Sequence, residues 1–438
     1  MLAGAAAEDH ADAQARHAGY SSRTVLTAFA DRARPVLLVV LLAALATSIT
    51  AIQIVAALLG LALLVRLRAP AARRRFRAPL AAPVLAFAAV SLASAVGARE
   101  PWDALDRTLG VVWLALLWAV LDAFQDAAHV RRALGVFFAA VAVASTYALV
   151  QTWACTTSVP LPDWAGALLK VRLEHCRVTQ PFRAKGFFSI YMTFAGTLTV
   201  ALALALARLA QGAGGAWRAL PPTVLALVAL GLTLVRSAWL GCAAAIGLLV
   251  VLSRRLALVL PIVGAIVVAL SVHSPFQARL FSTLDPTEST ARERLHLWRA
   301  GGRMLREAPL LGLGPGAVRR HYPEYKDPEG VRTHTSHLHN NLVQIAAERG
   351  LLGLAAWLWI WVAFYRRAAG IYRALPRARA DDRALVAGSL AAVTGFLVMG
   401  LFEYNFGDAE VLDLVLVVMA FPFVVARDAA PAAPGTVA

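Results

Sequence analysis

Three histidines lie close together at the start of a long apolar segment. They are His334, His337 and His339, and the segment begins at residue 341. An imidazole can take up a proton near neutral pH, bind a metal ion, or hydrogen-bond at the end of a helix. The spacing H-x-x-H-x-H is compatible with a metal site, but no cysteine or carboxylate accompanies it in the sequence. We favour proton transfer by His337 and His339 over metal binding and helix capping.

A polar stripe follows these histidines on the apolar segment. Asn340, Gln344 and Glu348 recur at four-residue spacing, which places them on one face of a helix. Such a stripe is typical of a cavity wall, so Asn340 and Gln344 are candidates for substrate binding.

Basic residues outside the short loops form a second group of candidates. The segment 154–185 is rich in Lys and Arg, and its last members, Arg183 and Lys185, lie directly before the next apolar segment. Arg236 lies within the apolar stretch 232–241, where a charge is costly unless it pairs, snorkels or faces water. Both positions indicate anion binding; the alternatives are a solvated basic loop that touches lipid headgroups, and snorkelling of Arg236.

A third group lies on a predicted helix that begins at Ser289 or Thr290 and ends before Pro309. Leu295, Trp298 and Leu305 are expected to form its apolar face. The basic side chains on the other face are Arg292, His296, Arg299, Arg303 and Arg306. Such a stripe fits a diphosphate, with Arg292, Arg299 and Arg303 as candidates, or an interfacial helix on anionic headgroups. The stretch 312–316, "GLGPG", lacks the lysine and hydroxyl residue of a P-loop and predicts a turn.

The composition indicates which elements hold these residues. Of 438 residues, 59% are hydrophobic, and apolar runs long enough to cross a bilayer recur along the chain. The predicted fold is an all-α polytopic membrane protein with about twelve transmembrane helices. They are expected at 35–49, 51–66, 79–97, 106–124, 132–153, 186–209, 220–236, 237–252, 256–273, 341–365, 384–402 and 409–426.

The charge pattern predicts the topology. The net charge is +16, but most arginines lie in short loops between apolar segments, which favours topology signals and anionic-lipid contacts over nucleic-acid binding. With twelve spans these loops fall on one side, so both termini are expected in the cytoplasm.

The predicted organisation follows from this topology. It comprises a cytoplasmic tail (1–34), nine membrane helices (35–273) with an external loop at 154–185, a large external loop (274–340) that carries the histidines, three further helices (341–426) and a second cytoplasmic tail (427–438). Cys155 and Cys176 share the first external loop, where they either form a disulfide or remain two separate thiols.

Four stretches, taken together and in order, resemble bacterial lipopolysaccharide O-antigen ligases and their relatives. They are "RAKGFFSIYMTFA" (183–195), "LTLVRSAWLG" (232–241), "ARERLHLWRAGGRMLREAPLLGLGPGAV" (291–318) and "HLHNNLVQIAAERGLLGL" (337–354). The resemblance implies a C-type glycosyltransferase-like membrane fold. It also implies inverting glycosyl transfer that needs no metal and no cofactor, at a site in the inner membrane that faces the periplasm.

The resemblance also implies roles for individual residues. His339, the histidine of the His-Asn pair, or His337 beside it would deprotonate the acceptor hydroxyl. Arg183 and Arg236, with Lys185 nearby, would hold the diphosphate of the donor, an undecaprenyl diphosphate-linked O-antigen. The acceptor would be the lipid A–core oligosaccharide. Val235 departs from the small polar residue that relatives often carry before the arginine, which weakens the assignment of Arg236.

Three other functions share parts of this pattern. An O-antigen polymerase would use the same chemistry with a second lipid-linked glycan as acceptor, and a protein O-oligosaccharyltransferase would use a protein. A transporter or flippase for an anionic lipid would use the arginines without needing the histidines. It would also be expected to show paired repeats or broken membrane helices, and the sequence indicates neither.

Overall fold

The computed structural model describes residues 27–156, 182–260, 263–264, 277, 281 and 289–429. Within these ranges the chain forms helices and turns and no strand. The N-terminal half contains a helix over residues 27–44, then α2 (Ile49–Leu67), α3 (Pro70–Arg75), α4 (Ala81–Val96), α5 (Pro101–Thr108), the 3-10 helix η1 (Leu109–Ala115), α6 (Leu116–Ala123), α7 (Ala127–Thr156) and α10 (Tyr191–Gln211). The C-terminal half contains α11 (Leu220–Leu232), α12 (Arg236–Ser253), α15 (Ser289–Glu307), α16 (Ala317–Tyr325), α17 (Asn341–Ala374), α18 (Ala380–Met399), the 3-10 helix η4 (Asn405–Gly407) and α19 (Ala409–Ala429).

Eight helices in the described residues are long and apolar enough to cross a membrane, counting Pro101–Ala123 as one. Two shorter apolar helices, Ala81–Val96 and Ala216–Leu232, accompany them. The prediction of a multi-pass, all-α membrane protein is therefore confirmed. The number twelve stays a prediction, because the expected span at 256–273 lies mostly outside the described residues.

The centre of the bundle consists of α10, α12, α18 and α19, where small residues let the helices approach closely. A Cβ on Gly241 of α12 would lie 2.6 Å from the carbonyl oxygen of Gly395 on α18. A Cβ on Gly196 of α10 would lie 2.9 Å from the side chain of Val411 on α19. Within lipid such close packing replaces the hydrophobic effect as the source of helix association.

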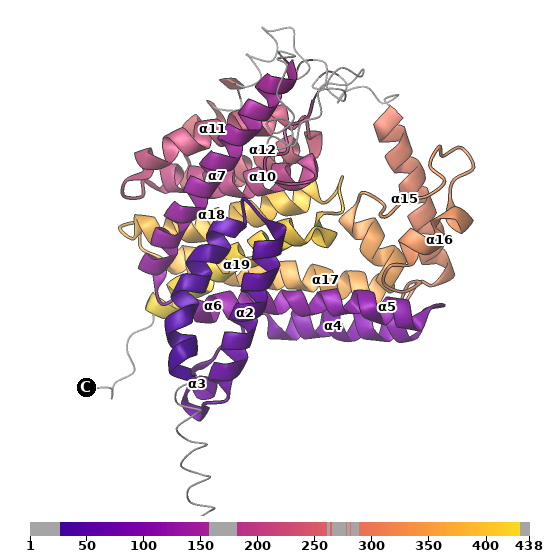
Figure 1. Ribbon diagram of the computed structural model, residues 1–438, viewed down its shortest axis with the longest axis horizontal. Coiled ribbons are helices and arrows are strands. Elements are labelled where there is room, and N and C mark those ends of the chain that lie inside the picture. Colours follow the sequence, from indigo (N-terminus) through magenta and orange to yellow (C-terminus); the bar gives the residue numbers. More distant parts are fainter. Residues whose placement is uncertain are drawn as a thin grey trace, which may run out of the picture.

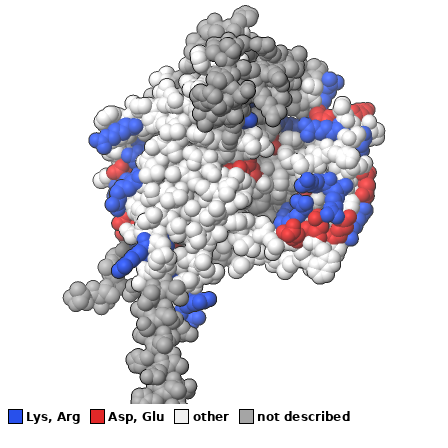
Figure 2. All heavy atoms as spheres, in the orientation of Figure 1, with Lys and Arg blue, Asp and Glu red and all other residues white. Residues whose placement is uncertain are grey.

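Charged residues gather at the two ends of the bundle. Figure 2 shows a broad face with few charges, apart from a small acidic patch near its middle, between a group of Lys, Arg, Asp and Glu on one side and a second, mainly basic group on the other. The first group belongs to α15 and α16, which lie at one end of the bundle in Figure 1. A largely uncharged band between two charged rims is the surface that a membrane-spanning protein presents to lipid.

At the basic end, loops that are far apart in the sequence contact one another. Gln211 Nε2 donates to the hydroxyl of Tyr372 over 3.1 Å, and Arg131 Nη1 lies 3.0 Å from a carboxylate oxygen of Asp382. The arginine-rich loops thus lie together at the end of α17 opposite its histidines. Which side of the membrane each end faces stays a prediction.

The helix α15 has the predicted bounds but a different buried face. Its buried residues are Leu297, Ala300, Gly301 and Met304. Leu295, which was expected on the apolar face, is 45% exposed, so that part of the prediction is wrong. The reason is a close approach: a Cβ on Gly301 would lie 2.4 Å from the side chain of Val343 at the start of α17. A pattern built on large apolar residues does not detect a face made of small ones.

The helix α17 is broken at Gly350, where the backbone has φ 64° and ψ −170°. A short segment lies against the break and bonds to the backbone groups there. Leu313 and Gly314 donate to the carbonyls of Ala347 and Glu348, over 3.0 Å each, and the amide of Leu351 donates to Pro309 over 2.8 Å. The "GLGPG" stretch is therefore the predicted turn and also a brace for a broken membrane helix. The sequence indicated no broken membrane helix, and this expectation is wrong for α17. The break is tolerated because residues 309–314 form hydrogen bonds with the backbone groups that it leaves free.

Candidate active site

His337 and His339 meet a carboxylate that is distant in the sequence. His339 Nδ1 lies 2.9 Å and 3.1 Å from the two carboxylate oxygens of Glu403, which lies in the turn between α18 and α19. His337 Nδ1 lies 3.7 Å from the nearer oxygen of Glu403. The two imidazole rings meet edge to face with centroids 4.2 Å apart. The structure thus brings together the two histidines that the sequence favoured and adds an acid that was not among the predicted site residues. His334 is exposed and takes no part.

A network of asparagines fixes this arrangement. Asn340 caps α17 by accepting from the amide of Val343 over 3.1 Å, and its Nδ2 donates to Leu401 over 2.8 Å. Asn341 Nδ2 donates to Asn405 Oδ1 over 2.7 Å, and the amide of Asn341 donates to Gly400 over 2.7 Å. These bonds tie the start of α17 to the turn that carries Glu403. Both ends of the Asn340 amide are used in these bonds, and its role in substrate binding stays a prediction.

The backbone of His339 is strained. Its φ is +50°, a region that few residues other than glycine adopt, and it costs roughly 1–3 kcal/mol. The conformation turns the ring towards Glu403, and the cap formed by Asn340 stabilises it. Strain of this kind is often found at functional positions.

The charge state of the group follows from its surroundings. Burial lowers the pKa of His337 to about 4, and the neighbouring His339 and Arg332 act in the same direction. Burial acts to raise the pKa of Glu403, but the hydrogen bond with His339 and the nearby charges of His339, His337 and Arg294 together outweigh it, so this pKa lies below its ordinary value. Near neutral pH, His337 is neutral and Glu403 is ionised.

The tautomer of His339 follows from the same contact. An ionised carboxylate can only accept, so Nδ1 of His339 carries the proton and Nε2 keeps its lone pair. The guanidinium of Arg332 approaches that second nitrogen, with Nη1 3.5 Å from Nε2. The imidazole of His339 thus has one nitrogen held by a carboxylate and the other in a long contact with an exposed guanidinium. Once an acceptor hydroxyl takes the place of that contact, the ring has the arrangement of a general base.

Glu403, Arg332 and Arg294 were missed by the sequence reasoning. Arg294 contributes positive charge that lowers the pKa of Glu403. The signal for Glu403 was present, because "FEYNFGDAE" (402–410) places an acid in an external turn between two membrane segments. What the sequence did not show is that this turn lies against the histidines.

The predicted donor-binding residues lie in neighbouring segments. The amide of Ala184, between Arg183 and Lys185, donates to the carbonyl of Leu232 over 3.0 Å, just before the turn that leads to Arg236. Arg236 is the first residue of α12, and the guanidinium of Arg183 lies over the ring of Tyr191, 4.7 Å from its centroid. The side chains of Arg183, Lys185 and Arg236 are all half-buried.

The same region is linked to the turn that carries Glu403. Thr193, at the start of α10, donates to a carboxylate oxygen of Asp408 over 2.6 Å. Asp408 directly precedes α19, as Glu403 follows α18. The segments with Arg183, Lys185 and Arg236 and the turn with Glu403 therefore belong to one end of the bundle.

The arginines of α15 have partners within their own module. His296, Arg299 and Arg303 all contact Asp327, at distances of 2.8, 3.1 and 3.2 Å. The hydrogen bond with His296, followed by that with Arg299, holds the pKa of Asp327 well below its usual range. Arg299 and Arg303 thus brace the segment after α16, whereas Arg292 is exposed and its role in substrate binding stays a prediction.

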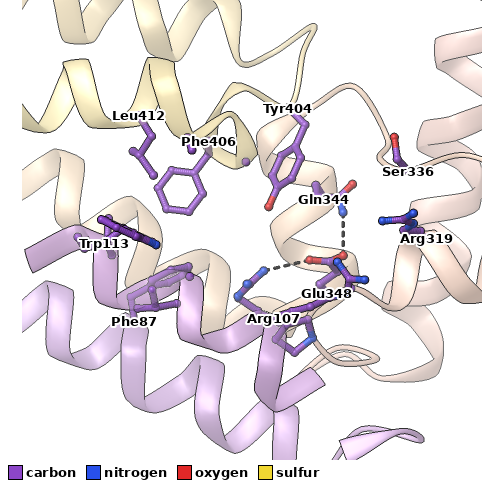
Figure 3. Close-up of a pocket in the computed structure, with 18 of the residues that line it drawn as sticks. Phe87, Arg107, Trp113, Arg319, Ser336, Gln344, Glu348, Tyr404, Phe406 and Leu412 are labelled. Atoms are coloured by element: carbon purple, nitrogen blue, oxygen red, sulfur yellow. Dashed lines mark hydrogen bonds and ion pairs between the residues drawn. The ribbon is translucent and has the colours of Figure 1, made fainter. Parts of the chain in front are cut away.

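A pocket of about 360 Å³ lies beside the imidazole pair. One end is apolar and aromatic, with Phe87, Trp113, Phe406 and Leu412, and the other is polar, with Arg319, Ser336, Gln344 and Glu348 (Figure 3). Tyr404 lines the pocket and its ring centroid is 6.0 Å from that of His337, so it connects the two sites. The expected polar wall is confirmed for Gln344 and Glu348.

A buried ion pair forms part of this wall. Arg349 Nη1 lies 3.1 Å from a carboxylate oxygen of Glu348, and Arg349 Nε donates to Ser91 over 3.0 Å. Gln344 Nε2 donates to Glu348 over 2.8 Å. Each charge is paired and hydrogen-bonded, as buried charges must be. The pair lies directly before the break at Gly350.

The cysteines agree in part with the prediction. Cys155, in the last turn of α7, is disulfide-bonded, and Cys242 is a buried free thiol. Cys176, the predicted partner, lies outside the described residues.

Residues 221–358 match a protein family described as O-antigen ligase. The matched region is similar to the O-antigen ligase superfamily. This O-antigen ligase region extends from α11 to the middle of α17 and includes Arg236, His337 and His339. Arg183 and Glu403 lie outside it.

The name of one relative agrees with this family match. A protein of Rickettsia conorii (strain ATCC VR-613 / Malish 7), whose name proposes a polysaccharide ligase, is 25% identical over 124 residues. The similarity covers 27% of this chain and 28% of the relative, so it spans just over a quarter of either protein. Together with the membrane helices, these matches support a membrane enzyme of the O-antigen ligase and polymerase type.

The imidazole pair and Glu403 also resemble a metal site. One ligand atom from each of His337, His339 and Glu403 lies within 4.8 Å of the other two. Two imidazoles and a carboxylate are common ligands of transition metals. The sequence-based prediction of metal-independent chemistry therefore requires a direct test.

Proposed function

We propose that this protein is a glycosyltransferase of the periplasmic side of the bacterial inner membrane. It would move O-antigen polysaccharide from undecaprenyl diphosphate to the lipid A–core oligosaccharide and so complete lipopolysaccharide. The observation that carries the proposal is the contact between His339 and Glu403 at the start of a membrane helix, within a region of the O-antigen ligase superfamily.

The chemical step is an inverting displacement. Nε2 of His339 takes the proton from an acceptor hydroxyl as its oxygen attacks the anomeric carbon of the donor sugar. The bond from that carbon to the diphosphate oxygen breaks, and the diphosphate leaves with the electron pair. The imidazolium that forms on His339 is stabilised by Glu403, whose carboxylate accepts from Nδ1.

The basic residues would bind the donor. Arg183, Lys185 and Arg236 come from neighbouring segments at the same end of the bundle as Glu403, and guanidinium groups suit a diphosphate because they donate in pairs and stay charged. Arg332, beside Nε2 of His339, adds positive charge near the reacting atoms. Such charge stabilises the leaving group in the transition state.

The pocket beside His337 would receive part of the acceptor. Its polar end offers Arg319, which is exposed and forms no ion pair in the described part of the chain, and its aromatic end offers Phe87 and Trp113. Aromatic faces and polar side chains together are common in sites that bind sugars or lipid headgroups. Donor and acceptor would then approach the base from different directions.

Three alternatives share this geometry or part of it. An O-antigen polymerase would place a second lipid-linked glycan in the pocket, and a protein O-oligosaccharyltransferase would place a protein there. The break in α17 resembles the discontinuous helices of transporters and favours a lipid transporter. The strained histidine with its carboxylate favours an enzyme, because transport does not need a base.

A reconstituted reaction separates these functions. The purified protein would be given one lipid-linked donor together with lipid A–core, a second lipid-linked glycan and pilin as competing acceptors. We expect glycan transfer to lipid A–core above all. Transfer to the glycan or to pilin alone would replace the ligase with a polymerase or a protein transferase. The absence of any transfer, with movement of the lipid across the bilayer, would establish a flippase.

A further inference from the structure

A second pocket, of about 610 Å³, lies at the basic end of the bundle, far from the histidines along α17. Five arginines line it: Arg254, Arg255, Arg373, Arg377 and Arg383. The other lining residues are apolar or neutral, and among the described residues that line it there is no aspartate or glutamate. Five like charges around one hollow repel each other unless an anion binds between them.

The pocket forms where three helices end. Arg254 is the C-cap of α12, Arg255 donates to the carbonyl of Leu209 near the end of α10 over 2.9 Å, and Arg383 donates to Leu375 just after α17 over 2.8 Å. Two of the five arginines, Arg255 and Arg383, are thus used to satisfy the free carbonyls of helix ends.

The other three arginines of the pocket do not bond to a helix end. Arg254, Arg373 and Arg377 are exposed, and their side chains form no ion pair or hydrogen bond in the part of the chain that the structure describes. They come from two segments that face each other across the hollow, one after α12 and one at the end of α17.

Several other arginines at this end of the molecule are paired with an acid. Arg34 and Arg66 share Asp122, and Arg131 and Arg379 share Asp382. Asp381, the remaining acid near the pocket, accepts from the amide of Gly214 over 3.0 Å. The general excess of arginine on one side of a membrane protein explains a basic surface. It does not explain why three exposed and unpaired arginines from two segments lie around one hollow.

The depth of the pocket indicates the ligand. Arg254 directly follows a membrane helix and Arg373 lies in the last turn of another, so their guanidinium groups lie near the level of lipid headgroups. The rest of the lining includes Ala210, Val251, Leu252 and Ala369, which can contact acyl chains. A phospholipid fits both parts of this surface.

We propose that this pocket is a specific binding site for an anionic phospholipid with two phosphate groups, of the cardiolipin class. Guanidinium groups from two facing segments can each engage one phosphate in a bidentate contact. Basic pockets between membrane helices bind such headgroups in general. The site is independent of the proposed glycosyl transfer, since it lies at the other end of α17.

The test uses the full chain in nanodiscs and measures bound lipid by native mass spectrometry. Nanodiscs contain either cardiolipin or phosphatidylglycerol at matched surface charge, and a third arm offers inorganic pyrophosphate in zwitterionic lipid. The variant is R254Q/R373Q/R377Q. The control is R74Q/R218Q/R366Q, which removes the same charge from exposed arginines at the same end that do not line this pocket.

We expect cardiolipin to bind the wild type in preference to phosphatidylglycerol and to lose about fivefold in affinity for each pocket arginine removed. The control should retain binding within about twofold. Thermal unfolding in zwitterionic lipid checks that both variants fold.

Equal losses in variant and control, or equal binding of phosphatidylglycerol at matched charge, would show a non-specific basic surface. Binding of pyrophosphate without cardiolipin would show a soluble ligand. Each of these results overturns the proposal.

Discussion

Nδ1 of His339 and Oε1 of Glu403 lie 2.9 Å apart although 64 positions separate the two residues in the chain. The contact joins the residue before the N-cap of one membrane helix to the connection between two others. It determines which nitrogen of His339 is protonated and leaves Nε2 as the atom that can accept a proton. The proposed chemistry depends on this pair.

The first prediction concerns the three residues of the base. His339→Ala should lower glycan transfer by about 10²–10⁴-fold, the usual contribution of a general base. Glu403→Gln should lower kcat by a smaller factor, because the amide can still orient the ring but does not stabilise the imidazolium. His337→Ala should have the least effect, since His337 lacks a hydrogen bond with Glu403 at 3.7 Å. Full activity of His339→Ala in a purified assay would remove it from the mechanism.

The second prediction concerns the donor site. Arg183→Gln and Arg236→Gln should each weaken transfer by at least about tenfold, because a charge-assisted contact with the diphosphate is lost. Arg306→Gln, an exposed arginine on α15, is the matched control and should leave the rate unchanged. Steady-state kinetics with varied donor concentration provide the measurement. If the two variants and the control behave alike, the diphosphate binds elsewhere.

The third prediction concerns pH and His337. Its pKa is about 4 in the folded protein and near 6.5 when exposed, so below pH 6.5 the unfolded state binds more protons. Stability should therefore fall as the pH drops from about 6.5 towards about 4, by roughly 1–3 kcal/mol from this group. The midpoint of thermal unfolding, measured against pH, should depend less on pH in His337→Asn than in the wild type. Identical slopes would show that His337 titrates normally.

The fourth prediction concerns metal. The arrangement of His337, His339 and Glu403 could hold a transition-metal ion, whereas the proposed mechanism uses His339 as a free base. Wild-type protein treated with excess chelator and then freed of it should keep its full activity. Added Zn²⁺ should inhibit it, because the ion would occupy Nε2 or displace Glu403. Loss of activity on chelation, with recovery on adding metal, would instead make the site a catalytic metal centre.

The fifth prediction concerns the break in α17. Gly350→Ala should destabilise the protein by more than about 1 kcal/mol, because φ is +64° and the new Cβ would lie 2.2 Å from the backbone of Leu310. Gly370→Ala, on the same helix with open space around it, should be neutral or stabilising by about 0.5–1 kcal/mol. Thermal unfolding of the two variants side by side provides the comparison. Equal stability of both would show that the break relaxes freely.

The sequence by itself determined the membrane-spanning helices and the types of residue that could act. An apolar run must satisfy its backbone internally within lipid, so composition and length alone predict helices such as Tyr191–Gln211 and Ala409–Ala429. The same local reasoning predicted the bounds of α15 and singled out His337 and His339, since imidazole is the ordinary base near neutral pH.

Only the tertiary structure decided how these residues combine. Glu403, Asp327 and the 309–314 segment find their partners across dozens of residues, and spacing along a helix does not encode contacts of that range. It placed Arg299 and Arg303 against Asp327, because a buried carboxylate requires partners wherever the fold places it, and their role in substrate binding stays a prediction. It also made His339, rather than His337, the imidazole that hydrogen-bonds to Glu403, because the fold places Nδ1 of His339 2.9 Å from the carboxylate and Nδ1 of His337 3.7 Å from it.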